Sequence, residues 1–161
     1  MESRGSHIAT LEKAVRQTAG PILEMGVGPH STPLLNELAV ELDRHVTSYE
    51  TNEEFYEIAE GYQNRWHDVR LVKHYNDADI CPRRDGVWGV AFFDHAPGSR
   101  RIVDMLRVRE KAIFVVCHDS EDGSDCIYHY SEIMPLFKYR FDSVGHPVQT
   151  SVLSMFKEFR A

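Results

Sequence analysis

Short apolar runs alternate with amphipathic stretches along the chain. The run 87–93, VWGVAFF, follows a turn at Asp85-Gly86 and is apolar throughout, as is typical of a central strand in a parallel sheet. The run 112–117, AIFVVC, has the same character, and a shorter run occupies 22–25. Between these runs, apolar residues recur at spacings of three and four, which indicates helices with one buried face. The alternation predicts an α/β protein.

The order of the predicted elements narrows the fold class. Two strand-like segments, 138–144 and 148–156, flank Gly145-His146-Pro147 and predict an antiparallel hairpin. We therefore expect an open, mostly parallel Rossmann-like sheet of about seven strands, with helices on both faces and a C-terminal hairpin. One domain should span 1–161, with 1–19 as a leading helix. The remaining strands are expected at 22–25, 45–49, 69–73, 87–93 and 112–117.

Three helices have predicted starts and predicted buried faces. The expected N-caps, in chain order, are Thr32, Thr51 and Ser99. Thr51 is expected to form a capping box with Glu54. The expected buried faces are Leu34, Leu35, Leu38 and Leu42 in the first helix, Phe55, Ile58, Ala59 and Tyr62 in the second, and Ile102, Val103 and Leu106 in the third.

The segment 21–32, PILEMGVGPHST, joins a predicted strand to a predicted helix through Gly26 and Gly28. Glycines let the backbone turn sharply beside a ligand, and a helix start presents unpaired N–H groups. Glu50 ends the next strand, where a carboxylate can accept hydrogen bonds from both ribose hydroxyls. A lone GxG also occurs in ordinary turns, and Ser31 replaces the third glycine of the dinucleotide fingerprint. The whole segment nevertheless favours a nucleoside-binding βαβ unit.

Polar residues also end the other central strands. Asp94 and His95 follow the run 87–93, and His118 and Asp119 follow 112–117. Ligands of open α/β sheets bind at the carboxyl ends of the strands. Asp94, His118 and Asp119 could hold one divalent ion that lowers the pKa of a substrate hydroxyl, or His118 could act as a base that Asp119 orients. The same residues also suit a turn cap and a solvated acidic loop.

Composition and charge limit the partners. The chain has 161 residues, 42% of them hydrophobic and 27% charged, which is ordinary for one domain with a full core. A formal net charge of −7 and the lack of a basic run disfavour a nucleic-acid partner, although Arg100, Arg101, Arg107 and Arg109 could form a small basic patch. No apolar run has membrane length, and the chain start resembles an amphipathic helix rather than a signal peptide. We therefore expect a cytoplasmic protein without a membrane partner.

Over nearly its full length the chain resembles the class I S-adenosylmethionine-dependent methyltransferases. The matching segments are ILEMGVG, SYETNEEFYEIAE, VAFFDHAPG, FVVCHDSED and the terminal hairpin. The resemblance implies S-adenosylmethionine as the cofactor, with Glu50 at the ribose and Asp77 near the adenine amino group. It also implies that Asp94 and His95 line this site. The residues implied at the methionine part of the cofactor are Glu24, Gly26, Gly28, Ser31 and Thr32.

Within that family, the Asp94-His95 step resembles the catechol-type metal-dependent O-methyltransferases, and sugar methyltransferases are an equally close comparison. The resemblance implies Asp94, His118 and Asp119 as catalytic residues and as ligands of a divalent metal such as Mg²⁺. The catechol type has an aspartate-asparagine pair where this chain has His118-Asp119, and no separate substrate-binding insertion is visible. The expected acceptor is a small molecule or a sugar, and a homodimer could complete its site.

Two other functions stay open. A protein that keeps the cofactor pocket but has lost catalysis would fit the short chain without a substrate lid. An NAD-dependent oxidoreductase would also use Gly26, Gly28 and Glu50. The missing third glycine, the acid Glu24 and the closing hairpin fit the methyltransferase sheet better.

Overall fold

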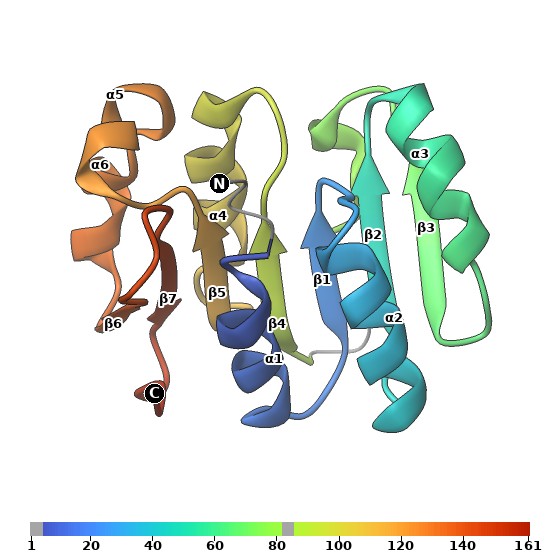
Figure 1. The fold of residues 1–161 in the computed structure, drawn as a ribbon, viewed down its shortest axis with the longest axis horizontal. Coiled ribbons are helices and arrows are strands. Elements are labelled where there is room, and N and C mark those ends of the chain that lie inside the picture. The colour runs from blue at the N-terminus through green and yellow to red at the C-terminus, as the bar shows by residue number, and fades with distance from the viewer. Residues whose placement is uncertain (1–4, 82–85) are drawn as a thin grey trace.

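A computed structural model describes residues 5–81 and 86–161, which form a seven-stranded sheet with helices on both faces (Figure 1). The strand order is β3-β2-β1-β4-β5-β7-β6. Neighbours from β3 to β5 pair in parallel, and β7 pairs antiparallel with both β5 and β6. The structure therefore confirms the predicted fold class and hairpin, with slightly shifted strand ends. The strands are β1 Ile22–Met25, β2 Val46–Glu50, β3 His67–Leu71, β4 Trp88–Phe93, β5 Ala112–His118, β6 Tyr139–Asp142 and β7 Thr150–Ser154.

Helices connect the strands as the alternation predicted. Residues 1–4 of the expected leading segment, and Asp85 of the expected turn, lie outside the described residues. Within the described ranges, no helix is both long enough and apolar enough to cross a membrane. The helices are α1 Ile8–Arg16, α2 Ser31–Glu41, α3 Glu53–Ala59, α4 Arg101–Val108, α5 Asp125–Tyr128 and α6 Tyr130–Ile133.

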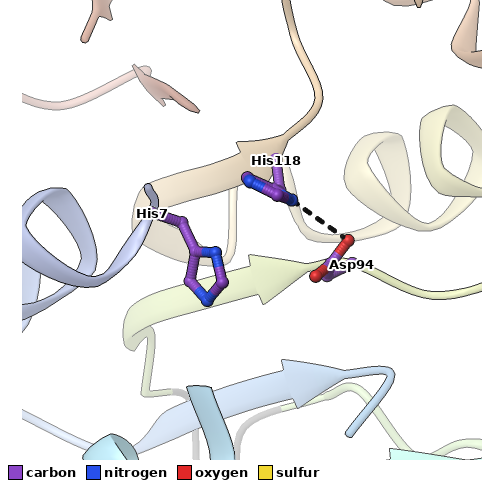
Figure 2. Close-up of side chains that lie close together, drawn as sticks. All are labelled: His7, Asp94 and His118. Carbon is purple, nitrogen blue, oxygen red and sulfur yellow. Dashed lines mark ion pairs between the residues drawn. The ribbon is translucent and has the colours of Figure 1, made fainter. Parts of the chain in front are cut away.

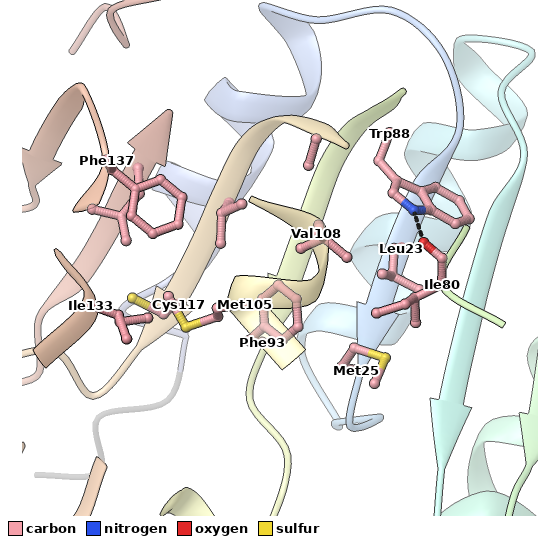
Figure 3. Close-up of a cluster of buried hydrophobic side chains, with 14 of the residues drawn as sticks. Leu23, Met25, Ile80, Trp88, Phe93, Met105, Val108, Cys117, Ile133 and Phe137 are labelled. Carbon is pink, nitrogen blue, oxygen red and sulfur yellow. Dashed lines mark hydrogen bonds between the residues drawn. The ribbon is translucent and has the colours of Figure 1, made fainter. Parts of the chain in front are cut away.

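Residues of β1, β2, β4, β5 and β7 enter two hydrophobic cores on opposite faces of the sheet. Phe92 and Leu35 belong to the core beneath α1 and α2. Phe93, Met105 and Trp88 belong to the other core, beneath α4 and α6 (Figure 3). Full burial of one such side chain contributes about 1.5–3 kcal/mol. The two cores therefore hold the sheet rigid and fix the positions of its strand ends.

Two predicted helix starts are wrong by one or two residues. α2 begins at Ser31 with His30 as its N-cap, so Thr32 lies inside the first turn. Ser99 lies in a 3₁₀ turn ahead of α4, whose N-cap is Arg100. Neither N-cap side chain accepts a hydrogen bond from the backbone N–H groups of its helix, so neither helix start has a side-chain cap.

α3 also starts and packs differently from the prediction. Asn52, not Thr51, is the cap, and its side chain accepts a hydrogen bond from the N–H of Phe55 at 3.2 Å. Only Ala59 of the predicted face is fully buried, whereas Phe55 and Ile58 are 57% and 71% exposed. The large side chains of this helix therefore face away from the core and line a surface pocket instead.

α4 buries a partly charged face in place of the predicted apolar one. Val103 and Leu106 are 45% and 42% exposed, whereas Arg101 and Asp104 are buried. Charged groups can be buried when they are paired, and both of these are paired. The arginines that could have formed a small basic patch therefore do not make an open basic surface, since Arg101 is buried and Arg107 bonds to Asp104.

Gly89 in β4 allows the connection between α1 and β1 to lie directly on the sheet. A Cβ at this position would lie 2.3 Å from the carbonyl oxygen of Ala19 and 2.3 Å from Nη2 of Arg44. Arg44 in turn donates hydrogen bonds to the carbonyls of Val15 at 2.6 Å and Gly20 at 2.7 Å. The position of α1 on the sheet thus depends on a glycine at 89.

Gly89→Ala should destabilise the fold by about 2 kcal/mol or more, because the added methyl group must displace backbone atoms. Gly61→Ala is the matched control, since no atom lies within 4 Å of a Cβ there. Its effect should stay within about 1 kcal/mol. Urea unfolding measures both variants, and equal effects would contradict the packing argument.

Candidate active site

The glycine loop between β1 and α2 packs onto the end of β4. Gly26 has a φ of +88°, and a Cβ there would lie 2.6 Å from the Cα of His95, so this position requires glycine. The N–H of Gly28 donates to Oγ1 of Thr32 at 3.0 Å. Ser31 is buried beside them in the first turn of α2. The structure thus brings the predicted loop residues together at the carboxyl end of β1.

Glu24 lies beneath this loop and is fully buried. Its carboxylate accepts hydrogen bonds from the hydroxyl of Ser48 at 2.5 Å and from that of Thr32 at 3.1 Å. Burial raises the pKa of Glu24 to about 7, although these hydrogen bonds act in the opposite direction. Because Glu24 has no exposed surface, its direct contacts are with the glycine loop, the first turn of α2 and β2.

Glu50, at the end of β2, is fixed next to the same loop. One carboxylate oxygen accepts from the N–H of Val27 at 3.1 Å. The other accepts from the N–H groups of Thr51 at 2.7 Å and Asn52 at 2.8 Å, and the Tyr75 hydroxyl lies 3.4 Å from it. Backbone donors therefore hold the carboxylate in a single orientation beside the glycine loop.

His95 lies on the other side of the loop, with its ring centroid 4.4 Å from that of Tyr75. Its Nε2 bonds to the buried carboxylate of Asp104 at 3.0 Å, which also pairs with Arg100 and Arg107. Burial outweighs the effect of Asp104 and lowers the pKa of His95, so the ring is neutral at neutral pH. A carboxylate only accepts, so Nε2 carries the proton. Nδ1 is left as a buried acceptor without a partner among the described residues.

Asp94 and His118 form a polar corner at the ends of β4 and β5 (Figure 2). The parallel pairing of Phe93 with Cys117 places the next residue of each strand side by side. Nδ1 of His118 lies 3.6 Å from Oδ1 of Asp94 and 3.3 Å from Oδ1 of Asp119. Burial acts to lower the pKa of His118, but the two carboxylates outweigh it and raise the pKa above its ordinary value.

Arg101 lies between the two carboxylates of this corner. It donates to Oδ1 of Asp94 at 2.9 Å, to Oδ2 of Asp119 at 3.1 Å and to the carbonyl of His95 at 2.8 Å. One guanidinium thus pairs with both acids. The predicted set of Asp94, His118 and Asp119 therefore does not offer an ion two free carboxylates, because an arginine cation already pairs with both.

His7 reaches the same corner from the segment before α1. Its ring lies edge-on to that of His118 at 4.6 Å and stacks on Phe92 at 5.3 Å. The residue is 5% exposed, and neither ring nitrogen has a hydrogen-bond partner within residues 5–81 and 86–161. Burial, assisted by His118, lowers the pKa of His7 to about 4, so the ring is neutral at neutral pH. The hydroxyl of Ser6 lies 2.9 Å from Nε2 of His118.

Two predicted residues lie at the margin of the site. Asp77 is exposed in the 3₁₀ turn Tyr75–Asp77 that follows β3. Asp119 has a φ of +56°, and its Oδ2 accepts from Tyr128 at 3.0 Å as well as from Arg101. Asp119 therefore supports the corner through these two contacts.

Three residues of the site escaped the sequence prediction, namely His7, Arg101 and Asp104. The last two share a stripe with Met105 and Val108 at positions i, i+3, i+4 and i+7 of α4. That spacing is typical of the buried face of a helix, but two of its four residues are charged, so the face does not read as apolar in the sequence. His7 carried no local signal, because it precedes its helix and meets the sheet only in the folded chain.

An apolar pocket of about 250 Å³ lies beside the glycine loop. Phe55 and Ile58 of α3 form one side of it, which accounts for their exposure. The remaining lining residues are Val27, Gly28, Pro29, Thr32, Ala59 and Tyr62.

No protein-family model and no curated protein matches this sequence. Several solved structures do resemble it. Cofactor-bound Rv0187 from MTB has a TM-score of 0.68 at 15% identity, over 98% of this chain and 82% of that one. A putative O-methyltransferase from Klebsiella pneumoniae has a TM-score of 0.65 at 13% identity, over 96% and 80%. The N-terminal domain of human METTL16 in complex with SAH has a TM-score of 0.64 at 11% identity, over 94% and 69%. At these identities the likeness shows the fold alone, and it agrees with the predicted open, mostly parallel Rossmann-like sheet with a C-terminal hairpin.

Glu24→Gln should stabilise the protein at alkaline pH. A carboxyl whose pKa rises from 4.5 to about 7 on folding destabilises the folded state at any pH at which it is ionised in the unfolded chain. The penalty is absent below pH 4.5, grows as the pH rises to 7, and then stays near about 3 kcal/mol.

Urea unfolding at pH 5 and pH 8 measures this effect. The gain of Glu24→Gln over the wild type should be larger at pH 8, by up to about 3 kcal/mol. Glu37→Gln, at an exposed position of α2, is the control and should show no such pH dependence. A gain for Glu24→Gln that is the same at both pH values would contradict the assignment.

Proposed function

We propose that this protein is an S-adenosylmethionine-dependent methyltransferase that acts on a hydroxyl oxygen of a small molecule or a sugar. The observation that carries the proposal is the arrangement at the carboxyl edge of the sheet. A glycine loop flanked by Glu50 and His95 adjoins a corner formed by Asp94 and His118. The first group suits a nucleoside cofactor, and the second suits proton removal from an acceptor.

The residues around the glycine loop fit the cofactor. Glu50 presents a carboxylate fixed by backbone donors, as the hydroxyls of a ribose require. Nδ1 of His95 is a buried acceptor without a partner among the described residues. Tyr75 packs against the His95 ring, and its hydroxyl lies 3.4 Å from the carboxylate of Glu50. An unpaired buried acceptor of this kind is satisfied when a ligand donor reaches it. S-adenosylmethionine would supply an activated methyl group on a good leaving group.

The polar corner supports transfer to oxygen. With a good leaving group, the protein has to align the acceptor and promote loss of its proton. His118 is held by Asp94 and Asp119, and Arg101 fixes both carboxylates. The corner is therefore ordered before an acceptor arrives, which lowers the cost of alignment.

Other functions would give different results in binding and turnover experiments. A protein that only binds the cofactor would keep the loop residues but show no turnover. NAD would suit Glu50 as well, although the loop has Ser31 in place of a third glycine. One of the similar structures is the METTL16 catalytic domain with the MAT2A 3′UTR hairpin 1, so RNA belongs among the acceptors to be tested. The net charge of −7 favours a small acceptor over RNA.

Calorimetry should show binding of S-adenosylmethionine and of its demethylated product. Glu50→Gln should weaken both by at least about tenfold, because the ribose loses an ionised acceptor. Glu54→Gln, at an exposed position of α3, is the matched control and should bind like the wild type. Failure of the wild type to bind either ligand, or tighter binding of NAD, would overturn the cofactor assignment.

Turnover should depend on the polar corner. With an acceptor found by screening phenols, catechols, sugars and RNA, His118→Gln should lower kcat by about 100-fold or more. Its affinity for S-adenosylmethionine should stay close to that of the wild type. Release of the demethylated product measures turnover.

His146→Gln is the control for that experiment, since His146 is exposed in the hairpin turn. Unchanged turnover in His118→Gln would refute the role of the corner. Cofactor binding without turnover on any acceptor would favour the non-catalytic alternative, and turnover on RNA alone would replace the small acceptor.

A further inference from the structure

We propose that His7, Asp94 and His118 form a binding site for a transition-metal ion such as Zn²⁺. Their side chains converge from the segment before α1, the end of β4 and the end of β5 (Figure 2). One ligand atom from each residue lies within 4.8 Å of the other two. Donors that share an ion at about 2.1 Å lie about 3.0–4.2 Å apart, so small side-chain rotations bring the three into coordination distance.

The ring nitrogens of His7 are the first argument for an ion. The ring is buried against Phe92, and both nitrogens lack a hydrogen-bond partner among the described residues. Stacking on Phe92 explains why a flat ring fits here, but an apolar ring would fit without leaving polar atoms unpaired. A metal ion between His7 and His118 would satisfy one of these nitrogens.

The orientation of His118 is the second argument. Its Nε2 is hydrogen-bonded to the hydroxyl of Ser6 at 2.9 Å, which directs Nδ1 towards Asp94. Metal-bound histidines usually bond through their second nitrogen in this way. The 3.6 Å between Nδ1 and Oδ1 of Asp94 is too long for a hydrogen bond and falls in the range expected for two ligands of one ion.

The donor types indicate which metals fit. Two imidazoles and one carboxylate favour zinc and its first-row neighbours, whereas Mg²⁺ prefers oxygen ligands only. Arg101 pairs with one oxygen of Asp94 and one of Asp119, the third ligand predicted from the sequence, and Asp119 also accepts from Tyr128. Among the described residues, Asp94 therefore has fewer competing partners than Asp119. His7 takes the place of Asp119 in the set. Three protein ligands leave a coordination position for water or a substrate oxygen.

The consequence for catalysis rests on the proposed function, whereas metal binding itself does not. An ion at this corner would lie where the acceptor hydroxyl is expected and would lower the pKa of that hydroxyl. His118 would then act as a metal ligand rather than as the base that removes the acceptor proton.

Zinc binding to the full chain, purified without a histidine tag and stripped with a chelator, tests the site directly. Calorimetry in the absence of S-adenosylmethionine should show one Zn²⁺ per chain. His7→Phe keeps the ring on Phe92 and should weaken binding at least tenfold, as should Asp94→Asn. His146→Ala, in the exposed hairpin turn, should bind like the wild type.

Co²⁺ substitution provides a second, spectroscopic measurement of the ligands themselves. A nitrogen-bound Co²⁺ of low coordination number should give visible absorption in the wild type that His7→Phe lacks. Absence of Zn²⁺ binding by the wild type would overturn the proposal, as would equal binding by His7→Phe or loss of binding in His146→Ala. Since cofactor binding is measured separately, either proposal can fail without the other.

Discussion

The pairing of Arg101 with the strand ends is the interaction on which the site depends. Its guanidinium is buried and donates to Asp94, Asp119 and the carbonyls of His95 and His118. One side chain from α4 thereby joins the ends of β4 and β5. A buried cation without these partners would be strongly unfavourable, so the cation and its acceptors are stable only as a group.

A second buried polar network supports the glycine loop at the same edge of the sheet. Glu24 accepts from Thr32 and Ser48, and Thr32 accepts from the loop at Gly28. The network joins β1, β2, the glycine loop and the first turn of α2. Ionisation of Glu24 lowers the stability of the folded protein, so the hydrogen bonds that order the loop come with an unfavourable buried charge. The glycine loop and the polar corner at Asp94 and His118 are thus each built on buried polar groups.

Much of the architecture could be predicted from the chain because the signals were local. The apolar run 87–93 predicted a central strand, which the structure has at 88–93, and the strand-like segments on either side of Gly145 predicted the hairpin. The faces of α3 and α4 could not be predicted in the same way. Phe55 is exposed because it lines a pocket together with the glycine loop. Arg101 is buried because its acidic partners come from the ends of other elements.

The sequence by itself determined the fold class, the glycine loop and the polar strand ends at Glu50, Asp94 and His118, since hydrophobic period and turn chemistry are properties of neighbouring residues. Only the tertiary structure decided which polar groups meet. It brought His7 from the chain start to His118 and placed Arg101 between two carboxylates. Contacts between residues so far apart in the chain depend on how α1 and α4 pack on the sheet, which no local pattern encodes.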